Sequence, residues 1–487
     1  MKKLYSIITA VSLAVSGVLG VYMFCQRFAL LHLGLLYDEL YSMATAFPGF
    51  SWAYIWREML LKDVNLPLYN FILYGWNHLF PLTPFYMRLL SALVSAATVP
   101  LVWFLAPRRW SPIQRFIFTA LMAGSFALVQ FAGVIRAYSF AVLAVSAFTL
   151  QALSLLDLLS TRKKPSTKRW AAFFFTGLFA AYLHYFSSAL FFITALLIFF
   201  YACYFKTGRK TVFWGTAAVF ACWLPWVYHT VTLMSAPGSS WWYATPPLQA
   251  SFEIAQFLFG SDRLLGGLVI LTVLAGTSIL FAYKKTLLLR TDFILPLGQN
   301  LILLGVVAAV SHKYNLWLDR YFLAAMPSFL LLLAYALFHL QARHKILIVL
   351  LPLLLMGWIG EHWEFVHNAK QEPTGLKNAL THLTQVEKRH TLLVDTAKTG
   401  YPTAALQVMY TFYAPKNYAL ELIPLTVQNR ELAFTGEKLP VLIPVCSVQH
   451  LIFTETTYGL EEAREPLIFA PDICILSAKP GRIIEND

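Results

Sequence analysis

Residues 170–205 read WAAFFFTGLFAAYLHYFSSALFFITALLIFFYACYF, and this stretch contains no Lys, Arg, Asp or Glu. A helix crosses the hydrocarbon core of a bilayer in about 20 residues, so the stretch is too long for one crossing. Two helices joined by a tight turn keep every backbone hydrogen bond satisfied inside the membrane. The sequence therefore predicts a helical hairpin with the segment LHYFSS, residues 183–188, at its turn.

The composition extends this conclusion to the whole chain. Of its 487 residues, 58% are hydrophobic and only 13% are charged, which is outside the usual range of soluble domains. Lys and Arg give a net charge of +13, but they fall in short clusters between apolar runs and read as topology signals. We therefore expect a mainly α, polytopic membrane protein that contacts membrane lipids and no nucleic acid. About eleven transmembrane helices are expected, at roughly 4–24, 86–106, 116–134, 138–156, 170–184, 186–204, 212–231, 264–282, 293–311, 321–340 and 346–360.

The basic clusters also predict the orientation of the chain. TRKKPSTKR (161–169), KTGRK (206–210) and ARHK (342–345) lie on the same side of the membrane as Lys2 and Lys3. The positive-inside rule places this side in the cytoplasm. The first apolar run is long and lacks a clear cleavage site, so we expect a retained helix rather than a signal peptide. The expected location is the plasma (inner) membrane, with a cytoplasmic N-terminus.

Two segments are expected outside the bilayer. Residues 25–85 mix acids with many aromatic residues, which favours helices lying in the membrane interface. Residues 361–487 contain the short β-rich runs TLLVDT, VLIPV, HLIFTE and DICILSA. We expect a transmembrane domain over 1–360 and a small extracytoplasmic α/β domain over 361–487. Within the latter, Cys446 and Cys474 could form a disulfide in an oxidising compartment.

Acidic residues are scarce before residue 361, and their placement is informative. Four of the nine lie in the first outer loop: Asp38, Glu39, Glu58 and Asp63. Carboxylates beside a bilayer are costly to desolvate and are often functional when present. The alternative is that Asp38 caps an interfacial helix and Glu39 is merely solvated.

A cationic group is expected on the same side of the membrane. Arg136 in IRAY, His184 in HYF and Arg320 in DRYF each stand beside an aromatic residue at an outer connection. The fork of donors on arginine matches the oxygens of a phosphate. Interface anchoring explains any one of these residues equally well. Three such residues facing an acidic loop favour a shared cavity.

Several apolar blocks follow one another in an informative order along residues 1–340. They are YDELYSMATA (37–46), DVNLPLYNFILYGWNHLFPLTPFYMRLLSALVSAATVPLVWFLAPRR (63–109), VIRAYSFAVLAVSAFTLQAL (134–153), HYFSSALFFITALL (184–197) and DRYFLAAMPSFLLLLA (319–334). In this order they resemble the GT-C fold glycosyltransferases, specifically bacterial relatives of the dolichyl-phosphate-mannose-protein mannosyltransferases and of the lipid A aminoarabinose transferase. The chain departs from many members of this family at Leu66-Pro67-Leu68-Tyr69, where they have a double proline.

The resemblance implies an enzyme that moves a sugar from a polyprenyl-phosphate donor to an envelope acceptor, which is a glycan, a lipid or a protein. Transfer occurs on the outer side of the membrane with inversion, which requires a base opposite the leaving group. Asp38 is the leading catalytic carboxylate and Glu39 the second. The expected substrate-binding residues are Asp63, Tyr69, Arg136, Tyr138, His184, Tyr185, Arg320 and Tyr321. No cofactor is certain, and a divalent metal ion on Asp38, Asp63 and His184 is left open.

Two other functional classes fit a polytopic basic chain. A lipid or glycolipid transporter would favour inverted repeats and ionisable groups near the bilayer midplane. A non-catalytic scaffold would need neither the acids nor the arginines. The sugar, the acceptor, the polyprenol length and the oligomeric state stay open.

Overall fold

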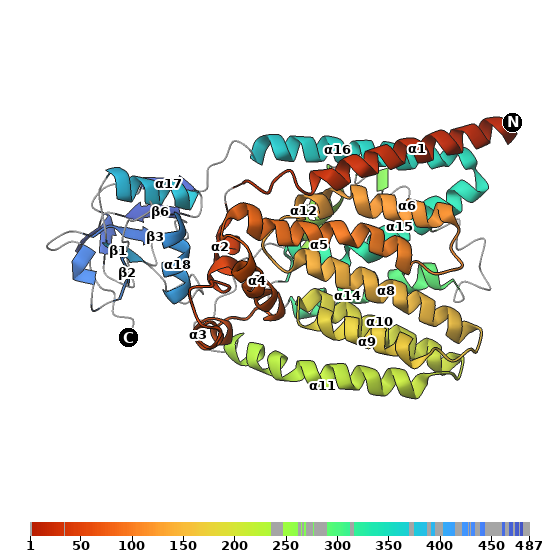
Figure 1. The fold of residues 1–487 in the computed structure, drawn as a ribbon, viewed down its shortest axis with the longest axis horizontal. Helices are drawn as coiled ribbons and strands as arrows, with labels where there is room; N and C mark the ends of the chain where they lie inside the picture. The colour runs from red at the N-terminus through yellow and green to blue at the C-terminus, as the bar shows by residue number, and fades with distance from the viewer. Residues whose placement is uncertain are drawn as a thin grey trace.

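The fold is that of a multi-pass membrane protein. The computed structural model describes residues 2–33, 35–234, 247–261, 290–311 and 316–369, with single residues between 264 and 276 and separate segments between 375 and 480. Eight helical segments in this part of the chain are long and apolar enough to cross a membrane. They are α1 (Lys2–Gln26), α5 (Pro84–Leu105), α8 (Tyr138–Ser160), α10 (Tyr185–Tyr204), α11 (Arg209–Met234), α14 (Thr291–Val310), η3 with α15 (Asp319–Ala325 and Met326–Arg343), and η4 with α16 (Lys345–Val349 and Leu350–Ala369). They run side by side in one bundle (Figure 1).

The charge-free stretch forms the expected hairpin. Helix α9 (Thr167–Ala181) turns at Tyr182 and is followed by α10, and His184 caps the start of α10. The hydroxyls of Ser187 and Ser188 donate hydrogen bonds to the carbonyls of Ala180 and Ala181, at 2.8 and 3.0 Å. These bonds satisfy the carbonyls at the end of α9 inside an apolar environment.

The span expected at 116–134 is broken. Helix α6 (Pro112–Gly124) ends at Ser125, and the short α7 (Phe126–Gln130) follows in a new direction. Arg27 is buried at this break and donates to the carbonyls of Met122 and Ala123, at 2.8 and 2.6 Å. A cation at a helix C-terminus offsets the dipole and the unpaired carbonyls. The span expected at 264–282 lies largely outside the described residues.

A buried amide joins four helices in the middle of the bundle. Gln299 of α14 donates to the hydroxyls of Thr149 on α8 (3.1 Å) and Thr194 on α10 (2.7 Å). Its carbonyl oxygen accepts from Ser328 of α15 at 2.9 Å. The Gln299 side chain is fully buried, and these bonds replace the water that the bilayer core cannot supply.

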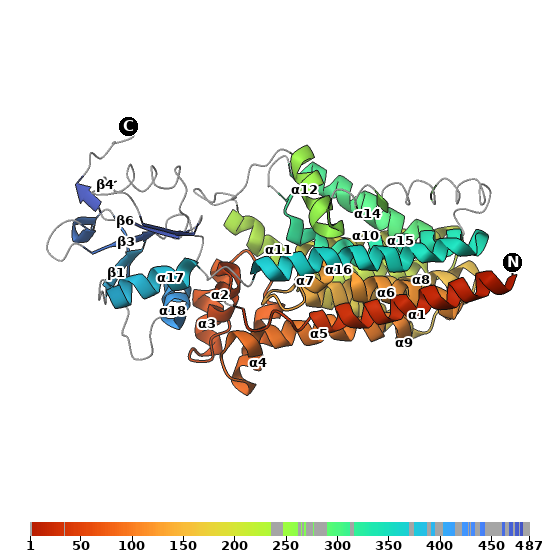
Figure 2. The ribbon, with the colours of Figure 1, turned by 90° about the horizontal axis from the view of Figure 1, so that it is seen from above.

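The loop between α1 and α5, which the charge pattern predicts to lie on the outer side of the membrane, folds into short helices, as expected. They are α2 (Tyr37–Ala44), α3 (Trp52–Glu58), η1 (Leu60–Lys62) and α4 (Leu68–Leu79). A further helix, α12 (Pro247–Phe259), lies near η3. The loop helices occupy one end of the bundle, opposite the N-terminus (Figures 1 and 2).

An α/β unit follows α16 at the same end of the molecule. Its five-stranded sheet has the order β2-β1-β3-β6-β5, in which β1 is parallel to β2 and β3, and β6 is antiparallel to β3 and β5. Helix α18 packs against α2 of the outer loop (Figure 1). The run HLIFTE and Cys446 lie outside the described residues. Strands β4 and β7 form a separate pair. The helices and strands of this unit are α17 (Gly375–Thr381), η5 (His382–Val386), β1 (Thr391–Val394), α18 (Thr403–Tyr413), β2 (Glu421–Pro424), η6 (Arg430–Ala433), β3 (Val441–Ile443), β4 (Leu460–Glu462), β5 (Leu467–Ala470), β6 (Ile473–Leu476) and β7 (Ala478–Pro480).

Candidate active site

Helix α2 places the two adjacent carboxylates in its first turn. The helix begins after Leu36, whose extended backbone lets its amide donate to Glu39 Oε2 at 2.8 Å. The N-cap is therefore Leu36 and not Asp38, so the capping alternative for Asp38 is wrong. Successive residues of a helix point about 100° apart, because one turn takes 3.6 residues. Asp38 and Glu39 consequently face different surroundings.

Glu39 lies in the protein interior and is fully buried, so the alternative of a solvated Glu39 is wrong. Its Oε2 contacts Nη2 of Arg88, on α5, at 2.5 Å, and its Oε1 accepts from the amide of Ile135 at 2.9 Å. Burial raises the pKa of Glu39, whereas Arg88 and two backbone amides oppose this shift. Because all three partners are donors, the geometry is that of a bound carboxylate anion. Glu39 thus ties α2 to α5 and to the turn that precedes α8.

Asp38 faces a different direction, toward η3. Its Oδ2 lies 3.4 Å from Nη2 of Arg320, and about a third of each side chain is exposed. A pair at this distance and exposure is a weak ionic contact. The Asp38 carboxylate therefore remains accessible to a ligand.

Arg136 lies in the turn between α7 and α8, next to the residue whose amide Glu39 holds. Its Nη1 donates to the Ser42 hydroxyl, on α2, at 3.3 Å. The guanidinium is close enough to oppose the rise that burial causes in the pKa of Asp63, and to add to the lowering that burial causes in the pKa of His184. Arg136 is thus central to a group of polar side chains contributed by distant parts of the chain.

The imidazole of His184 lies between two tyrosines. Its ring centre is 5.9 Å from that of Tyr138 and 5.3 Å from that of Tyr321, both in edge-on geometry. Its Nδ1 accepts from the Phe186 amide at 3.2 Å. Burial and the nearby Arg136 lower the pKa of His184 to about 3. The ring is therefore neutral at pH 7, with its proton on Nε2.

Asp63 is a second buried carboxylate at this end of the molecule. Its Oδ1 accepts from the backbone and side-chain nitrogens of Asn65, at 3.0 and 2.9 Å. Burial raises the pKa of Asp63, and Asn65, Arg136 and Tyr41 act in the opposite direction. Asp63 therefore belongs to the electrostatic surroundings of Arg136.

Seven of the ten residues expected at the site lie in this neighbourhood: Asp38, Asp63, Arg136, Tyr138, His184, Arg320 and Tyr321. Two others border it: Tyr69 is close enough to Arg136, and Tyr185 to Asp63, for electrostatic interaction, but their hydroxyls bond to other partners. Tyr69 shares a hydrogen bond with Ser91 at 3.4 Å, and Tyr185 donates to the Val64 carbonyl at 2.7 Å. Glu39, the tenth, is enclosed by its own partners.

The metal-binding residues suggested by the sequence do not form a ligand set. Within the described part of the chain, no three His, Cys, Asp or Glu side chains are grouped so that they could hold a metal ion. Asp38 points to Arg320, Asp63 to Asn65, and His184 uses Nδ1 for the Phe186 amide. Asp38, Asp63 and His184 therefore do not fit a three-ligand site.

Sequence reasoning missed three supporting residues. Arg88 neutralises Glu39, Ser42 holds Arg136, and Asn65 holds Asp63. Arg88 carried a usable signal, because it is a charged residue within an otherwise apolar expected span. Ser42 and Asn65 carried none, since small polar residues are common in interfacial loops.

Comparison with solved structures identifies the architecture. ArnT from Cupriavidus metallidurans bound to undecaprenyl phosphate matches with a TM-score of 0.56 and 14% identity, over 97% of this chain and 97% of that chain. The chain has a GT-C fold. The apo state of the same ArnT gives a TM-score of 0.55 and 11% identity over 98% of both chains. An oligosaccharyltransferase from Archaeoglobus fulgidus, in complex with Zn and sulfate, gives a TM-score of 0.44 at 10% identity, over 89% of this chain and 67% of that chain.

The likeness is one of fold and not of sequence. No protein-family model matches the chain, and no curated protein matches its sequence. The match to ArnT spans nearly the full length of both chains. This fold brings the acidic loop and the basic residues to the same end of the bundle.

Proposed function

We propose that this chain is a membrane glycosyltransferase that moves a sugar from a polyprenyl-phosphate donor to an envelope acceptor, with inversion at the anomeric carbon. The observation that carries the proposal is the grouping of the accessible Asp38 with Arg136, Arg320 and a neutral His184 at one end of a GT-C bundle. A lipid phosphate needs cations near its oxygens, and an acceptor hydroxyl needs a base. The structural neighbour ArnT was bound to undecaprenyl phosphate, which supports a donor of this class.

In the proposed reaction, the acceptor oxygen attacks the anomeric carbon of the sugar while Asp38 takes the hydroxyl proton. The bond between the anomeric carbon and the phosphate oxygen breaks, and polyprenyl phosphate leaves with the bonding electrons. Arg136 and Arg320 stabilise the charge that develops on this phosphate. His184 contributes a neutral hydrogen-bond donor through Nε2, because its pKa is far below 7.

The contact between Asp38 and Arg320 suggests how donor binding prepares the base. At 3.4 Å the pair is weak, and the phosphodiester anion of the donor would compete for the same guanidinium. Recruitment of Arg320 by the phosphate would then release Asp38 toward the acceptor. The donor would thus bind before Asp38 becomes available to the acceptor.

Glu39 and Asp63 take supporting roles in this proposal. Glu39 fixes the start of α2 and the amide next to Arg136, so it sets the spacing between the base and the phosphate site. It is proposed as a positioning residue rather than a second catalytic carboxylate. Asp63, whose pKa is raised by burial, is proposed to bind a sugar or acceptor hydroxyl.

The same proposal implies an orientation of the chain in the membrane. The basic connections mark the cytoplasmic side, and the loop helices with the α/β unit lie at the opposite end of the bundle (Figure 1). The reaction would occur on the outer face of the plasma membrane. Residues 361–487 would form an extracytoplasmic domain, and residues 1–360 would carry the transferase chemistry.

The test compares the envelope lipids, glycans and proteins of cells with and without the gene, complemented by variants. Asp38→Asn is expected to be inserted normally and to leave the same component unglycosylated as the deletion does. Glu58→Gln is the matched control, because Glu58 is an exposed carboxylate of the same loop that pairs with Lys62 at 2.7 Å. Full activity of Asp38→Asn would refute the catalytic role. A deletion that changes the distribution of a glycolipid across the membrane, but no glycosylation, would favour a transporter.

A further inference from the structure

The end of the bundle that bears the N-terminus carries a dense patch of positive charge. Two connections form it, one between α8 and α9 and one between α10 and α11 (Figure 1). Gly208 of the second connection lies against Leu159 and Trp170, at the two edges of the first, so the connections are side by side. We call their eight exposed cations the basic patch: Arg162, Lys163, Lys164, Lys168, Arg169, Lys206, Arg209 and Lys210.

The basic patch has no acidic counterpart within the described part of the chain. Residues 158–210 contain no Asp or Glu. The acids at this end of α8 and α14, Asp157 and Asp292, both contact Arg109 in the connection between α5 and α6. None of the eight cations forms an ion pair with a described residue. Their combined charge therefore favours an anion from outside the chain.

Two of these cations stand at positions where the backbone favours glycine. Arg162 follows the end of α8 with φ 56°, and Lys206 follows the end of α10 with φ 55°. At both helix ends the amide of the next residue donates to a carbonyl five positions back, at 2.9 and 3.0 Å. Glycine is the usual residue in this helix-ending motif, because a side chain is strained in the left-handed conformation. Both turns thus retain a cation despite backbone strain.

Four other cations lie at helix starts, where the helix dipole favours acids. Lys168 and Arg169 are in the first turn of α9, and Arg209 and Lys210 are in the first turn of α11; neither turn contains an acid. The positive-inside rule explains basic residues anywhere in these connections, but it does not require them at these positions. Their placement adds the charge of two helix N-termini to that of the side chains, which is favourable for binding an anion.

Exposed aromatic side chains border the basic patch on its membrane side. Tyr204 lies at the end of α10, two positions before Lys206, and Phe213 and Trp214 follow Lys210 on α11. All three aromatic side chains are exposed. Aromatic residues exposed near the ends of spanning helices lie at the level of the lipid head groups. The anion that best fits this surface is therefore the head group of a membrane lipid.

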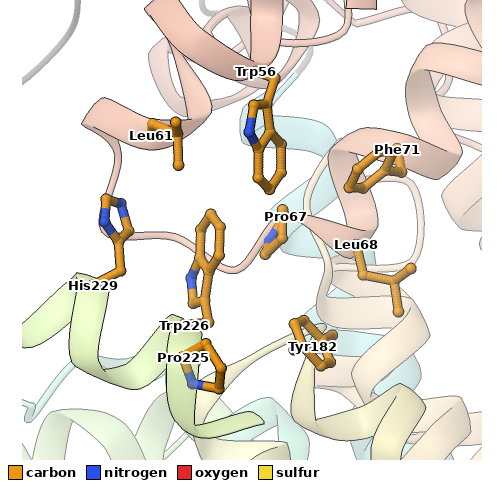
Figure 3. Close-up of a pocket in the computed structure, with 9 residues that line it drawn as sticks. All are labelled: Trp56, Leu61, Pro67, Leu68, Phe71, Tyr182, Pro225, Trp226 and His229. Atoms are coloured by element: carbon orange, nitrogen blue, oxygen red, sulfur yellow. The ribbon is translucent and has the colours of Figure 1, made fainter. Parts of the chain in front are cut away.

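An apolar pocket at the opposite end of the bundle provides a contrast. It has a volume of about 360 Å³ and lies between α3, α9 and α11 (Figure 3). Its nine described lining residues include Trp56, Leu61 and Trp226, but no Lys or Arg. A lipid phosphate needs a nearby cation, so this pocket does not fit an anionic head group. It supplies a control for lipid binding that depends on shape alone.

We propose that the basic patch binds a phospholipid with two phosphodiester groups, of the cardiolipin class, from the leaflet at this end of the bundle. One phosphate meets the five cations between α8 and α9, and the other meets the three between α10 and α11. Two linked phosphates bind more tightly than two separate ones, because the second contact is intramolecular. The bound lipid offsets the repulsion among the cations and joins the two connections. The proposal is independent of sugar transfer, since Asp38 lies at the opposite end of the bundle.

The binding test uses native mass spectrometry of the full-length protein in detergent, with cardiolipin and phosphatidylglycerol as probes at equal phosphate concentration. The wild-type protein should bind cardiolipin at least tenfold more tightly, and added salt should reduce this preference. Arg162→Gly with Lys206→Gly should weaken cardiolipin binding at least tenfold. Lys163→Gln with Lys210→Gln is a second variant of the patch and should have the same effect.

The matched control is Lys3→Gln with Lys345→Gln. It also removes two exposed cations from this end of the bundle. Lys3 is on α1, which lies on the opposite side of the bundle from α11, and Lys345 begins η4, which contacts α1 (Figure 1). Cardiolipin binding by this control should stay within twofold of the wild-type value.

Thermal unfolding separates binding from folding. Glycine relieves the strain at both turns, so Arg162→Gly with Lys206→Gly should unfold at the same temperature as the wild-type protein or a higher one when no lipid is added. Cardiolipin should raise the unfolding temperature of the wild-type protein, and should raise that of the glycine variant by less than half as much. Leu61→Trp, which fills the apolar pocket, should respond to cardiolipin as the wild-type protein does.

Three results would overturn the proposal. Equal affinity for cardiolipin and phosphatidylglycerol would show that the two phosphates are not recognised together. Equal loss of binding in the Lys3 and Lys345 control would show that net charge alone attracts the lipid. Loss of the cardiolipin effect in Leu61→Trp would place the lipid in the apolar pocket instead. Tenfold weaker binding by a glycine variant that is no less stable than the wild-type protein supports the proposal.

Discussion

Asp38→Asn is expected to abolish sugar transfer, and Glu39→Gln is expected to lower the stability of the protein, although the two carboxylates are adjacent. Glu39 is fully buried and holds Arg88, whose side chain is only 6% exposed. Glutamine at this position presents a donor amide toward groups that are themselves donors, and it removes the carboxylate that Arg88 contacts at 2.5 Å. Removing one partner of a buried ion pair costs about 3–5 kcal/mol. Asp38→Asn removes a contact at 3.4 Å in which about a third of each side chain is exposed, and such contacts contribute about 0–1 kcal/mol.

The assay measures chemical unfolding in detergent micelles and glycosyl transfer on the same preparations. We expect Asp38→Asn to unfold like the wild-type protein and to be inactive. Glu39→Gln should be destabilised by about 3 kcal/mol or more, and its remaining folded fraction should show a weaker apparent donor affinity because Arg136 is no longer fixed. The double variant Glu39→Gln with Arg88→Met should recover much of the lost stability, since it removes the uncompensated charge.

Two results would refute this reasoning. If Glu39→Gln is as stable as the wild-type protein, the ion pair with Arg88 does not hold the outer loop together. If Glu39→Gln is stable but inactive, Glu39 takes part in the chemistry, and the two carboxylates act jointly.

Three further changes test other parts of the structure. Arg136→Ala, and separately Arg320→Ala, should weaken binding of undecaprenyl phosphate about 10- to 100-fold, as expected for a lost charge-assisted hydrogen bond; unchanged binding in lipid nanodiscs would leave both residues as interface anchors. The pH profile of transfer between pH 5 and 8 should contain no ionisation of His184, because its pKa of about 3 leaves the ring neutral throughout; an inflection near pH 6.5 that disappears in His184→Gln would contradict this. Gln299→Leu should lower stability in detergent by about 1–2 kcal/mol, with undecaprenyl phosphate binding unchanged, and a stable variant would show that the buried amide is dispensable.

The sequence predicted the parts of the fold that depend on local composition. The charge-free stretch 170–205 required a hairpin in any bilayer, and the structure confirms it. The break after Gly124 was not predicted, because the Gly124-Ser125 pair that marks it is also common within continuous membrane helices. It depends on Arg27, a residue about 95 positions away that takes the carbonyls at the end of α6.

The sequence likewise predicted some features of the site and not others. Chemical type and side of the membrane were enough to propose Asp38, Arg136, His184 and Arg320, and the structure brings these residues into one neighbourhood. The resemblance ranked Asp38 before Glu39, but the sequence could not predict that Glu39 is buried while Asp38 stays partly exposed. Their difference arises from the rotation of about 100° between neighbouring helical residues, combined with where α5 places Arg88.

The position of α2 explains why a base and a phosphate site can be built from such distant segments. One face of the helix carries Glu39 into the bundle, where Arg88 and the amide of Ile135 hold it. Helix α18 of the C-terminal unit packs against the same short helix (Figure 1). An eight-residue helix is unstable alone, so its orientation must come from these tertiary contacts. The geometry of Asp38 therefore depends on the bundle and on the α/β unit together, and loosening either contact should reduce transfer before it unfolds the membrane domain.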